Sequence, residues 1–502
     1  MSATARPVPS GSLEPAAAPR LGQRALSLGA ANAFDFAVQF LLPVVLARSL
    51  DVAAFGEYRL LWLVAGTLLA VATLAMPASL YYYLPRSDAA EKRLYVNQTM
   101  LFLVAAGLVS AWAVSAWNPW LPETLRGLAR HEAVLPAFIL LWIVASLLDV
   151  LPTAEERVSW QAKVTVSLAA LRAVALSLVA ILTHELGPVL LVLLAFVAFK
   201  AALLLGYVAR FHGLRGPVLR WRAFADQLVY AAPLGAAGAL YGLRVQADQW
   251  LVAALFPLGL FAAFSIAAVL GPVLNLCRQS VNFAFLPTMS RRQATGDIAG
   301  MLALNSRGNI MVGAIVFPLF ALLFVFADQA VTLVYTAAYL DAAPVMRIYI
   351  IGIFALVVEL SSPTMLLRQA PFVMAVNAVA LVLGVGLNWT AAQHIGLAGA
   401  AVGSTIVIHL DRIVTLLRIS RITGVPVRRL QDWGTLARLA LFAVLGALLA
   451  WGVDALYFAA SGPLVRMLAG GAVLASAYAA AAALSGLAGI WLATVRSAKP
   501  GT

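Results

Sequence analysis

Apolar stretches of about 20 residues recur along almost the whole chain, and this feature limits the possible folds more than any other. A helix needs about that length to cross the roughly 30 Å hydrocarbon core of a bilayer. We place about fourteen spans. They lie near residues 25–47, 58–84, 94–117, 133–151, 160–183, 186–210, 227–253, 258–285, 308–328, 345–367, 371–393, 396–419, 435–457 and 464–494. The sequence therefore predicts an all-α integral membrane protein.

The composition agrees with a membrane protein and excludes most soluble classes. The chain is 63% apolar and 11% charged, whereas a soluble domain is about 45–50% apolar and about 25% charged. A net charge of +13 would also fit a nucleic-acid-binding protein. The positive residues, however, lie in short loops along one membrane face, where they meet anionic lipid. We therefore expect membrane lipids as partners, and no nucleic acid.

The distribution of the 34 Lys and Arg residues predicts the orientation. When successive spans cross in alternate directions, 23 of these residues fall on the side of the N-terminus, six on the other side and five within spans. Positively charged loops remain in the cytoplasm. We therefore expect both termini in the cytoplasm. The Ala content and the excess of Arg over Lys are typical of a GC-rich bacterium, and we expect the protein in the bacterial cytoplasmic (inner) membrane.

The chain divides into two similar halves and an additional C-terminal pair of helices. Weak similarity at offsets of about 205–210 residues indicates a duplication of six helices, with a pseudo-two-fold axis along the membrane normal, as in some transporters. The predicted parts are a disordered cytoplasmic tail (1–23), an N-lobe with spans 1–6 (24–210), a basic cytoplasmic linker (211–226), a C-lobe with spans 7–12 (227–425), and spans 13–14 with the C-terminal tail (426–502).

No motif in the sequence indicates catalysis. There is no P-loop, no HExxH, no CxxC pair and no nucleophile elbow, and Cys277 is the single cysteine. No loop is long enough to hold a catalytic domain. We therefore expect no enzyme activity, no metal and no cofactor.

Ionisable side chains within spans are costly and are the first candidates for function. Asp35 shares one face of the first span with Asn32 and Gln39. This polar face could line water, or it could bond to another helix. Lys200 in the sixth span is interpreted as extending its amine toward the membrane surface.

Two spans of the second half carry groups of polar residues. Arg244 and Asp248 are four residues apart and could neutralise each other on one helix face. In the next span Asn275, Arg278 and Asn282 have the spacing of a single face, which favours a hydrated cavity.

The candidate cavity charges are more often positive than negative, and guanidinium groups bind phosphate through paired hydrogen bonds. We therefore predict an anionic substrate. The predicted substrate-binding residues are Arg244, Arg278, Arg172, Asn275 and Asn282. The predicted ion-coupling carboxylates, for H⁺ or Na⁺, are Asp35, Asp248 and Glu359.

Five segments, in order, resemble the polysaccharide and lipid-linked oligosaccharide flippases of the multidrug/oligosaccharidyl-lipid/polysaccharide exporter superfamily. They are LARSLDVAAFGEY (46–58), YAAPLGAAGALYGLRVQADQWLVA (230–253), FLPTMSRRQATGD (285–297), YTAAYLDAAPVMRIYIIG (335–352) and GLAGAAVGSTI (396–406). The resemblance spans most of residues 25–425. One departure is that YTAAYL lacks the glycine usual before the tenth helix.

The resemblance implies a two-lobed, fourteen-helix flippase that moves a polyprenyl-diphosphate-linked glycan outward, its lobes exposing a central cavity to each side in turn. It places Asp35, Arg244, Asp248 and Arg278 at matching positions, and it makes polysaccharide-assembly enzymes expected partners. Two alternatives stay open: a cation-coupled drug exporter of the same superfamily, and a membrane-embedded polysaccharide polymerase or ligase.

Overall fold

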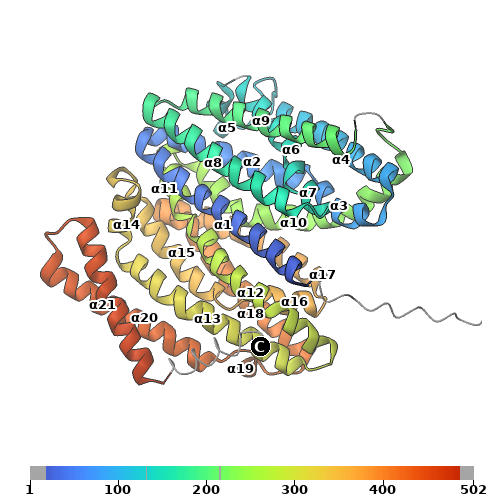
Figure 1. The fold of residues 1–502 in the computed structure, drawn as a ribbon. Helices are drawn as coiled ribbons and strands as arrows, with labels where there is room; N and C mark the ends of the chain where they lie inside the picture. The colour runs from blue at the N-terminus through green and yellow to red at the C-terminus, as the bar shows by residue number, and fades with distance from the viewer. Residues whose placement is uncertain (1–17, 132, 214–215, 487–502) are drawn as a thin grey trace, which may run out of the picture.

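A computed structural model describes residues 18–131, 133–213 and 216–486 of the chain. Over these residues the chain is helical and contains no β-strand. The helices form two bundles, with α20 and α21 at the edge of the second (Figure 1). The predicted all-helical, two-lobed membrane fold is confirmed.

The first bundle, called the N-lobe, extends from α1 to α9. Its main contacts are between α1 and α8, α4 and α6, and α6 and α9. Its helices are α1 (Ala18–Ser49), α2 (Val52–Ala72), α3 (Met76–Tyr83), η2 (Leu84–Arg86), α4 (Ala89–Ala113), α5 (Glu123–Ala129), α6 (Val134–Ala145), η3 (Ser146–Asp149), α7 (Leu151–Ala154), α8 (Val158–Thr183) and α9 (Leu186–Phe211).

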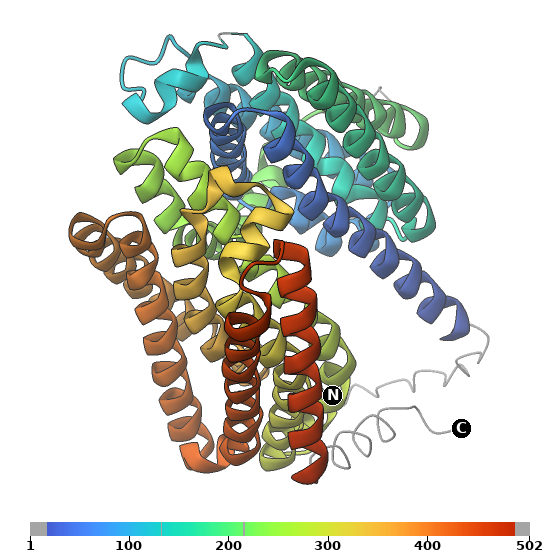
Figure 2. The same ribbon diagram turned by 90° about the vertical axis from the view of Figure 1, so that its left-hand side faces the viewer.

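The second bundle, called the C-lobe, extends from α10 to α18. Its helices are α10 (Trp221–Leu255), α11 (Leu258–Ala267), α12 (Leu270–Ala294), α13 (Ile298–Val325), α14 (Ala327–Val334), η4 (Ala337–Tyr339), α15 (Ala342–Leu356), α16 (Ser361–Leu366), α17 (Ala370–Ile395), η5 (Gly396–Ala398) and α18 (Gly399–Thr423). The remaining elements are α19 (Val427–Leu430), α20 (Trp433–Val453), the π-turn η6 (Asp454–Phe458) and α21 (Pro463–Leu484). Figure 2 shows α20 and α21 side by side.

The number of membrane crossings agrees with the predicted spans. Twelve helical segments of the described chain are long and apolar enough to cross a membrane. One of them, Ala370–Thr423, contains both α17 and α18, and the shorter α15 is continued by α16. These elements together give fourteen crossings.

Two predicted boundaries are wrong. Residues 18–23 were expected in the tail but are the first turns of α1, whereas residues 1–17 lie outside the described residues. Residues 221–226 were expected in the linker but begin α10. Both helices extend beyond the apolar run because Arg and Trp side chains are well accommodated at the membrane interface.

The second membrane crossing is broken between α2 and α3. Leu74 and Ala75 both have left-handed backbone conformations, with φ of 44° and 54°. Gly235 of α10 packs directly against this break, and a Cβ atom added at Gly235 would lie 2.3 Å from the carbonyl carbon of Leu74. The break therefore fits against α10 only because residue 235 has no side chain.

Hydrogen bonds connect the lobes along the edge formed by α2–α4 and α10–α11. At the end predicted to be outside, Arg59 Nε lies 3.0 Å from Ser265 Oγ. At mid-depth, Thr67 Oγ1 lies 2.6 Å from Gln246 Oε1. At the other end, the fully buried Gln227 accepts a bond from the side chain of Gln98 over 2.7 Å. This edge is closed throughout its depth.

The α1 edge of the lobe interface differs between its two ends. At its outer end, Arg48 Nε lies 2.9 Å from the carbonyl oxygen of Val334 in α14. The inner half and the middle of α1 instead carry exposed apolar side chains, including Ala30, Ala33 and Phe34. The lobes are therefore joined at the predicted outer end and leave α1 uncovered on the predicted cytoplasmic side.

Candidate functional site

The N-lobe contains a polar cavity of about 220 Å³ between α1, α6, η3, α8 and α9. Its apolar wall includes Trp142, Leu168 and Phe196. The polar lining residues are Asp35, Gln39, Asp149, Gln161, Thr165, Arg172 and Lys200. One water needs about 10–15 Å³ of such space, so the cavity could hold a cluster of waters or a small polar group.

Two ion pairs form the charged part of this cavity. Arg172 Nη2 lies 2.9 Å from Asp35 Oδ1, and Lys200 Nζ lies 2.7 Å from Asp149 Oδ2. The interpretation that Lys200 extends toward the membrane surface is wrong, because its side chain is 9% exposed and contacts Asp149. The cavity therefore contains two cations and two carboxylates, with no net charge.

A second polar cluster lies in the C-lobe around Arg244. Arg244 bonds Asn377 of α17 over 2.6 Å and Asp411 of α18 over 2.8 Å. Arg412 also contacts Asp411, at 3.3 Å. Neutralisation of Arg244 by Asp248, one reading of their spacing, is not observed, because α17 and α18 supply closer partners.

Asp248 has only uncharged partners. Its carboxylate accepts hydrogen bonds from the Tyr349 hydroxyl at 2.7 Å, from the Ser404 hydroxyl at 3.0 Å and from the backbone N–H of Gln249 at 2.8 Å. The residue is 5% exposed. Of the predicted coupling carboxylates it is the one without a bonded arginine, since Asp35 contacts Arg172 and Glu359 contacts Arg278.

Arg278 and Glu359 connect α12 to the break between α15 and α16. Arg278 Nη2 lies 3.2 Å from Glu359 Oε1. The same carboxylate accepts hydrogen bonds from the backbone N–H groups of Ser361 and Ser362, the first residues of α16. Glu359 therefore satisfies donors that the helix start would otherwise leave unpaired.

Asn275 and Asn282 lie on α12 with Arg278, as their spacing predicts. Asn275 is exposed and its Oδ1 lies 3.5 Å from Arg278 Nη1, whereas Asn282 is half-buried. Arg172 does not lie with the other predicted substrate-binding residues, because it faces the N-lobe cavity.

The ion-paired groups of the C-lobe include more guanidinium groups than carboxylates, and the nearby Asp248 carboxylate contacts none of them. Three guanidinium groups (Arg244, Arg278 and Arg412) bond two carboxylates (Asp411 and Glu359). The Nε atoms of Arg278 and Arg412 are buried and lack a hydrogen-bond partner. An anion would supply the missing acceptor and balance the charge.

Several residues of these clusters were not predicted as site residues. They are Asp149, Gln161, Asn377, Asp411 and Arg412. Each is polar and lies within or at the end of a predicted span, so the cost of burying a polar group was a usable signal. Which of them meet could not be read from the sequence, because their partners are distant along the chain.

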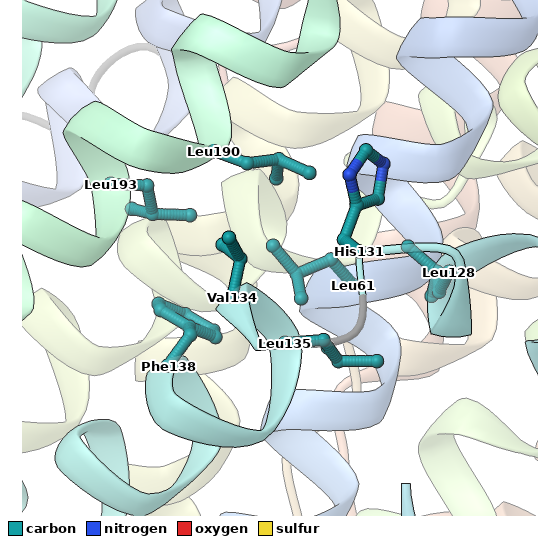
Figure 3. A pocket seen from close by; sticks show the side chains of 8 residues that line it. All are labelled: Leu61, Leu128, His131, Val134, Leu135, Phe138, Leu190 and Leu193. Atoms are coloured by element: carbon teal, nitrogen blue, oxygen red, sulfur yellow. The ribbon is translucent and has the colours of Figure 1, made fainter. Parts of the chain in front are cut away.

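A second, much smaller pocket of about 10 Å³ lies in the N-lobe beside His131 (Figure 3). The other side chains around it are apolar. This volume holds about one water and no substrate. No group of three or more His, Cys, Asp or Glu side chains that could hold a metal ion occurs among the described residues.

Neither a family model nor a curated protein sequence matches this chain. Several solved structures, however, have a similar fold. The lipid II flippase MurJ, in an inward closed conformation, is 11% identical with a TM-score of 0.71, over 92% of this chain and 99% of that chain. The fold is that of MurJ. An inward-facing multidrug resistance MATE family transporter of the MOP superfamily is 12% identical with a TM-score of 0.60, over 78% of this chain and 96% of that chain. The Vibrio cholerae MATE transporter VcmN is 13% identical with a TM-score of 0.52, over 83% of this chain and 99% of that chain.

Proposed function

We propose that this protein is a flippase that moves a polyprenyl-diphosphate-linked oligosaccharide or polysaccharide repeat unit from the cytoplasmic to the outer leaflet by alternating access. The observation that carries this proposal is the arginine-rich C-lobe cluster, in which three guanidinium groups bond two carboxylates within a membrane-spanning bundle. A diphosphate matches such a cluster through charge and paired acceptors. The likeness of the fold to a lipid II flippase supports the same class of substrate.

In this proposal Arg244 and Arg278 bind the diphosphate. With the predicted orientation, the joined ends of the lobes face outward, and the uncovered inner half of α1 faces the leaflet in which the substrate is loaded. Polysaccharide-assembly enzymes would supply the substrate and use the product.

Ion coupling is the second part of the proposal, and Asp248 is its strongest carboxylate. A carboxylate that contacts no arginine or lysine has no cation of the protein beside it, so a coupling ion could occupy that position. Asp248 is such a carboxylate, while Asp35 and Glu359 contact arginines. Collapse of the proton and sodium gradients should stop transport. Transport that continues unchanged would contradict coupling.

The test of the substrate class is removal of the guanidinium groups. Arg244→Ala and Arg278→Ala should each abolish export of the glycan while the protein remains in the membrane. Arg421→Ala, at an exposed position of α18, is the control and should export normally. Full export by both cluster variants would contradict the proposal.

Two further measurements separate the alternatives. A cation-coupled drug exporter would protect an overexpressing strain in a drug-susceptibility panel, although the positive C-lobe cluster disfavours cationic drugs. A polymerase or ligase would lengthen or transfer glycan without changing its leaflet, so the glycan should be assayed separately on each side of the membrane.

A further inference from the structure

The N-lobe cavity is open and amphipathic, and its ion pairs do not satisfy all its polar atoms. Three buried atoms of lining residues lack a hydrogen-bond partner: Arg172 Nε, Trp142 Nε1 and Gln161 Oε1. Two of them are donors and one is an acceptor. Buried polar groups without partners cost free energy, so a polar ligand in the cavity that reached any of these three atoms would be stabilised.

The charge balance of the cavity argues against an ion as its ligand. Arg172 and Lys200 already contact Asp35 and Asp149, which gives two positive and two negative charges. An anion would be repelled by both carboxylates and by the free oxygen of Gln161, and a cation by both cations. A neutral ligand with hydroxyl groups avoids both penalties, because each hydroxyl can donate and accept.

The shape and lining of the cavity also fit a sugar ring. Its volume is about 220 Å³, and Trp142, Phe196 and Leu168 give it an apolar wall beside the polar groups. A pyranose likewise has C–H faces and a rim of hydroxyls. The side chain of Asp149 is 56% exposed, so the cavity opens near the predicted cytoplasmic end of η3, on the side where the substrate is loaded.

We infer that the N-lobe cavity binds one neutral sugar residue of the lipid-linked glycan, while the C-lobe arginines bind its diphosphate. This inference rests on the proposed function. It gives the two lobes different tasks, because the ion-paired C-lobe groups are three arginines and two carboxylates, whereas the N-lobe cavity has two cations and two carboxylates. Arg172, grouped with the phosphate-binding arginines by sequence, becomes a sugar-binding residue.

The experiment compares binding of polyprenyl diphosphate with and without one sugar to the purified protein in nanodiscs. Lipids bearing either a neutral hexose or an N-acetylhexosamine serve as probes. For the wild type, at least one sugar should tighten binding by about three- to tenfold per hydrogen bond gained. Trp142→Phe and Gln161→Met should each reduce this gain by a similar factor, with binding of the bare diphosphate unchanged.

Trp62→Phe is the matched control. The Trp62 Nε1 atom is also buried and lacks a partner, and its ring lies 5.0 Å from that of Trp142, but Trp62 does not line the cavity. This variant should retain the full gain from the sugar.

Three results would overturn the inference. The first is no gain from either sugar in the wild type, as expected if the cavity holds only water. The second is a gain that Trp142→Phe and Gln161→Met both leave intact, and the third is an equal loss in Trp62→Phe. If the wild type bound neither the bare nor the glycosylated lipid, the proposed function itself would fail, which is a distinguishable result.

Discussion

Arg278 Nη2 on α12 lies 3.2 Å from Glu359 Oε1, at the point where the tenth membrane crossing is interrupted. The Glu359 side chain is 2% exposed and the Arg278 side chain 12% exposed. The Glu359 carboxylate also holds the start of α16 through Ser361 and Ser362. A substrate phosphate that bonds Arg278 would compete with the residue that fixes the position of α16, so binding and helix position are linked at one carboxylate.

The pair itself gives the first prediction. Glu359→Ala should destabilise the protein by about 3–5 kcal/mol, because it leaves the buried charge of Arg278 without a partner. Replacing both residues, with Arg278→Met and Glu359→Leu, should cost less than Glu359→Ala alone. Unfolding in detergent, analysed as a double-mutant cycle, checks this. If the double variant were no more stable than Glu359→Ala, the pair would not be the source of the loss.

The second prediction concerns the joined outer ends of the lobes. Arg59→Met removes the bonds from Arg59 to Ser265. Hydrogen bonds from a charged group contribute about 1.5–3 kcal/mol. The fraction of molecules with the outer ends apart should therefore rise about tenfold or more. Distances between spin labels on the outer ends of α2 and α11, in a Cys277→Ser background, provide the measurement. Arg126→Met, at an exposed outer position, should change nothing.

The third prediction uses the close contact of Gly56 on α2 with α11. A Cβ atom at this position would lie 2.4 Å from the carbonyl oxygen of Leu258. Gly56→Val should therefore keep the outer ends apart and stop transport without loss of protein from the membrane. Gly206 on α9 has no atom within 4 Å of such a Cβ, so Gly206→Val is the matched control. Normal transport by Gly56→Val would show that this contact is not needed.

The fourth prediction concerns acid stability at the predicted cytoplasmic end of the N-lobe. Glu155, between α7 and α8, lies 2.7 Å from His212 Nε2 and accepts a hydrogen bond from Tyr207. Burial alone would raise the pKa of the Glu155 carboxyl, but the close contact with the His212 ring, the hydrogen bond from Tyr207 and the charge of Arg157 hold this pKa below its usual value of 4.5.

Because the folded protein favours the charged form of Glu155, its contribution to stability is fully present above about pH 4.5 and is lost as the pH falls through the lower folded pKa. The Tm of the wild type should decrease over that acidic range. Glu155→Gln should have a lower Tm at neutral pH and a smaller decrease on acidification. Glu156→Gln, at the exposed neighbouring position, should follow the wild type. Identical acid profiles for wild type and Glu155→Gln would contradict this account.

The membrane crossings could be predicted from the sequence because each is determined locally. A helix in lipid must satisfy its own backbone hydrogen bonds, so a run of about 20 apolar residues is nearly sufficient evidence for a crossing. The interruptions were not predictable in the same way. The break at Leu74 and Ala75 is accommodated by Gly235, which is far away in the sequence.

Candidate residues were easier to find than their partners. Burial costs identify Arg244 and Asp248 as unusual from the sequence alone. Their spacing allowed a direct pair, but Arg244 bonds Asp411, 167 residues away, and Asp248 bonds Tyr349. Two side chains four residues apart can meet only if no third helix provides a better partner, and that depends on tertiary packing.

Hydrogen bonds close the lobe interface along the edge formed by α2 and α10. The lobes are therefore uncovered on the side of α1. A cargo that enters there can leave its hydrocarbon tail among the surrounding lipids, since only its head group has to enter the protein. Under the proposed function, transport should then be indifferent to the number of isoprene units, and carriers of short and long prenyl chains should be moved at similar rates.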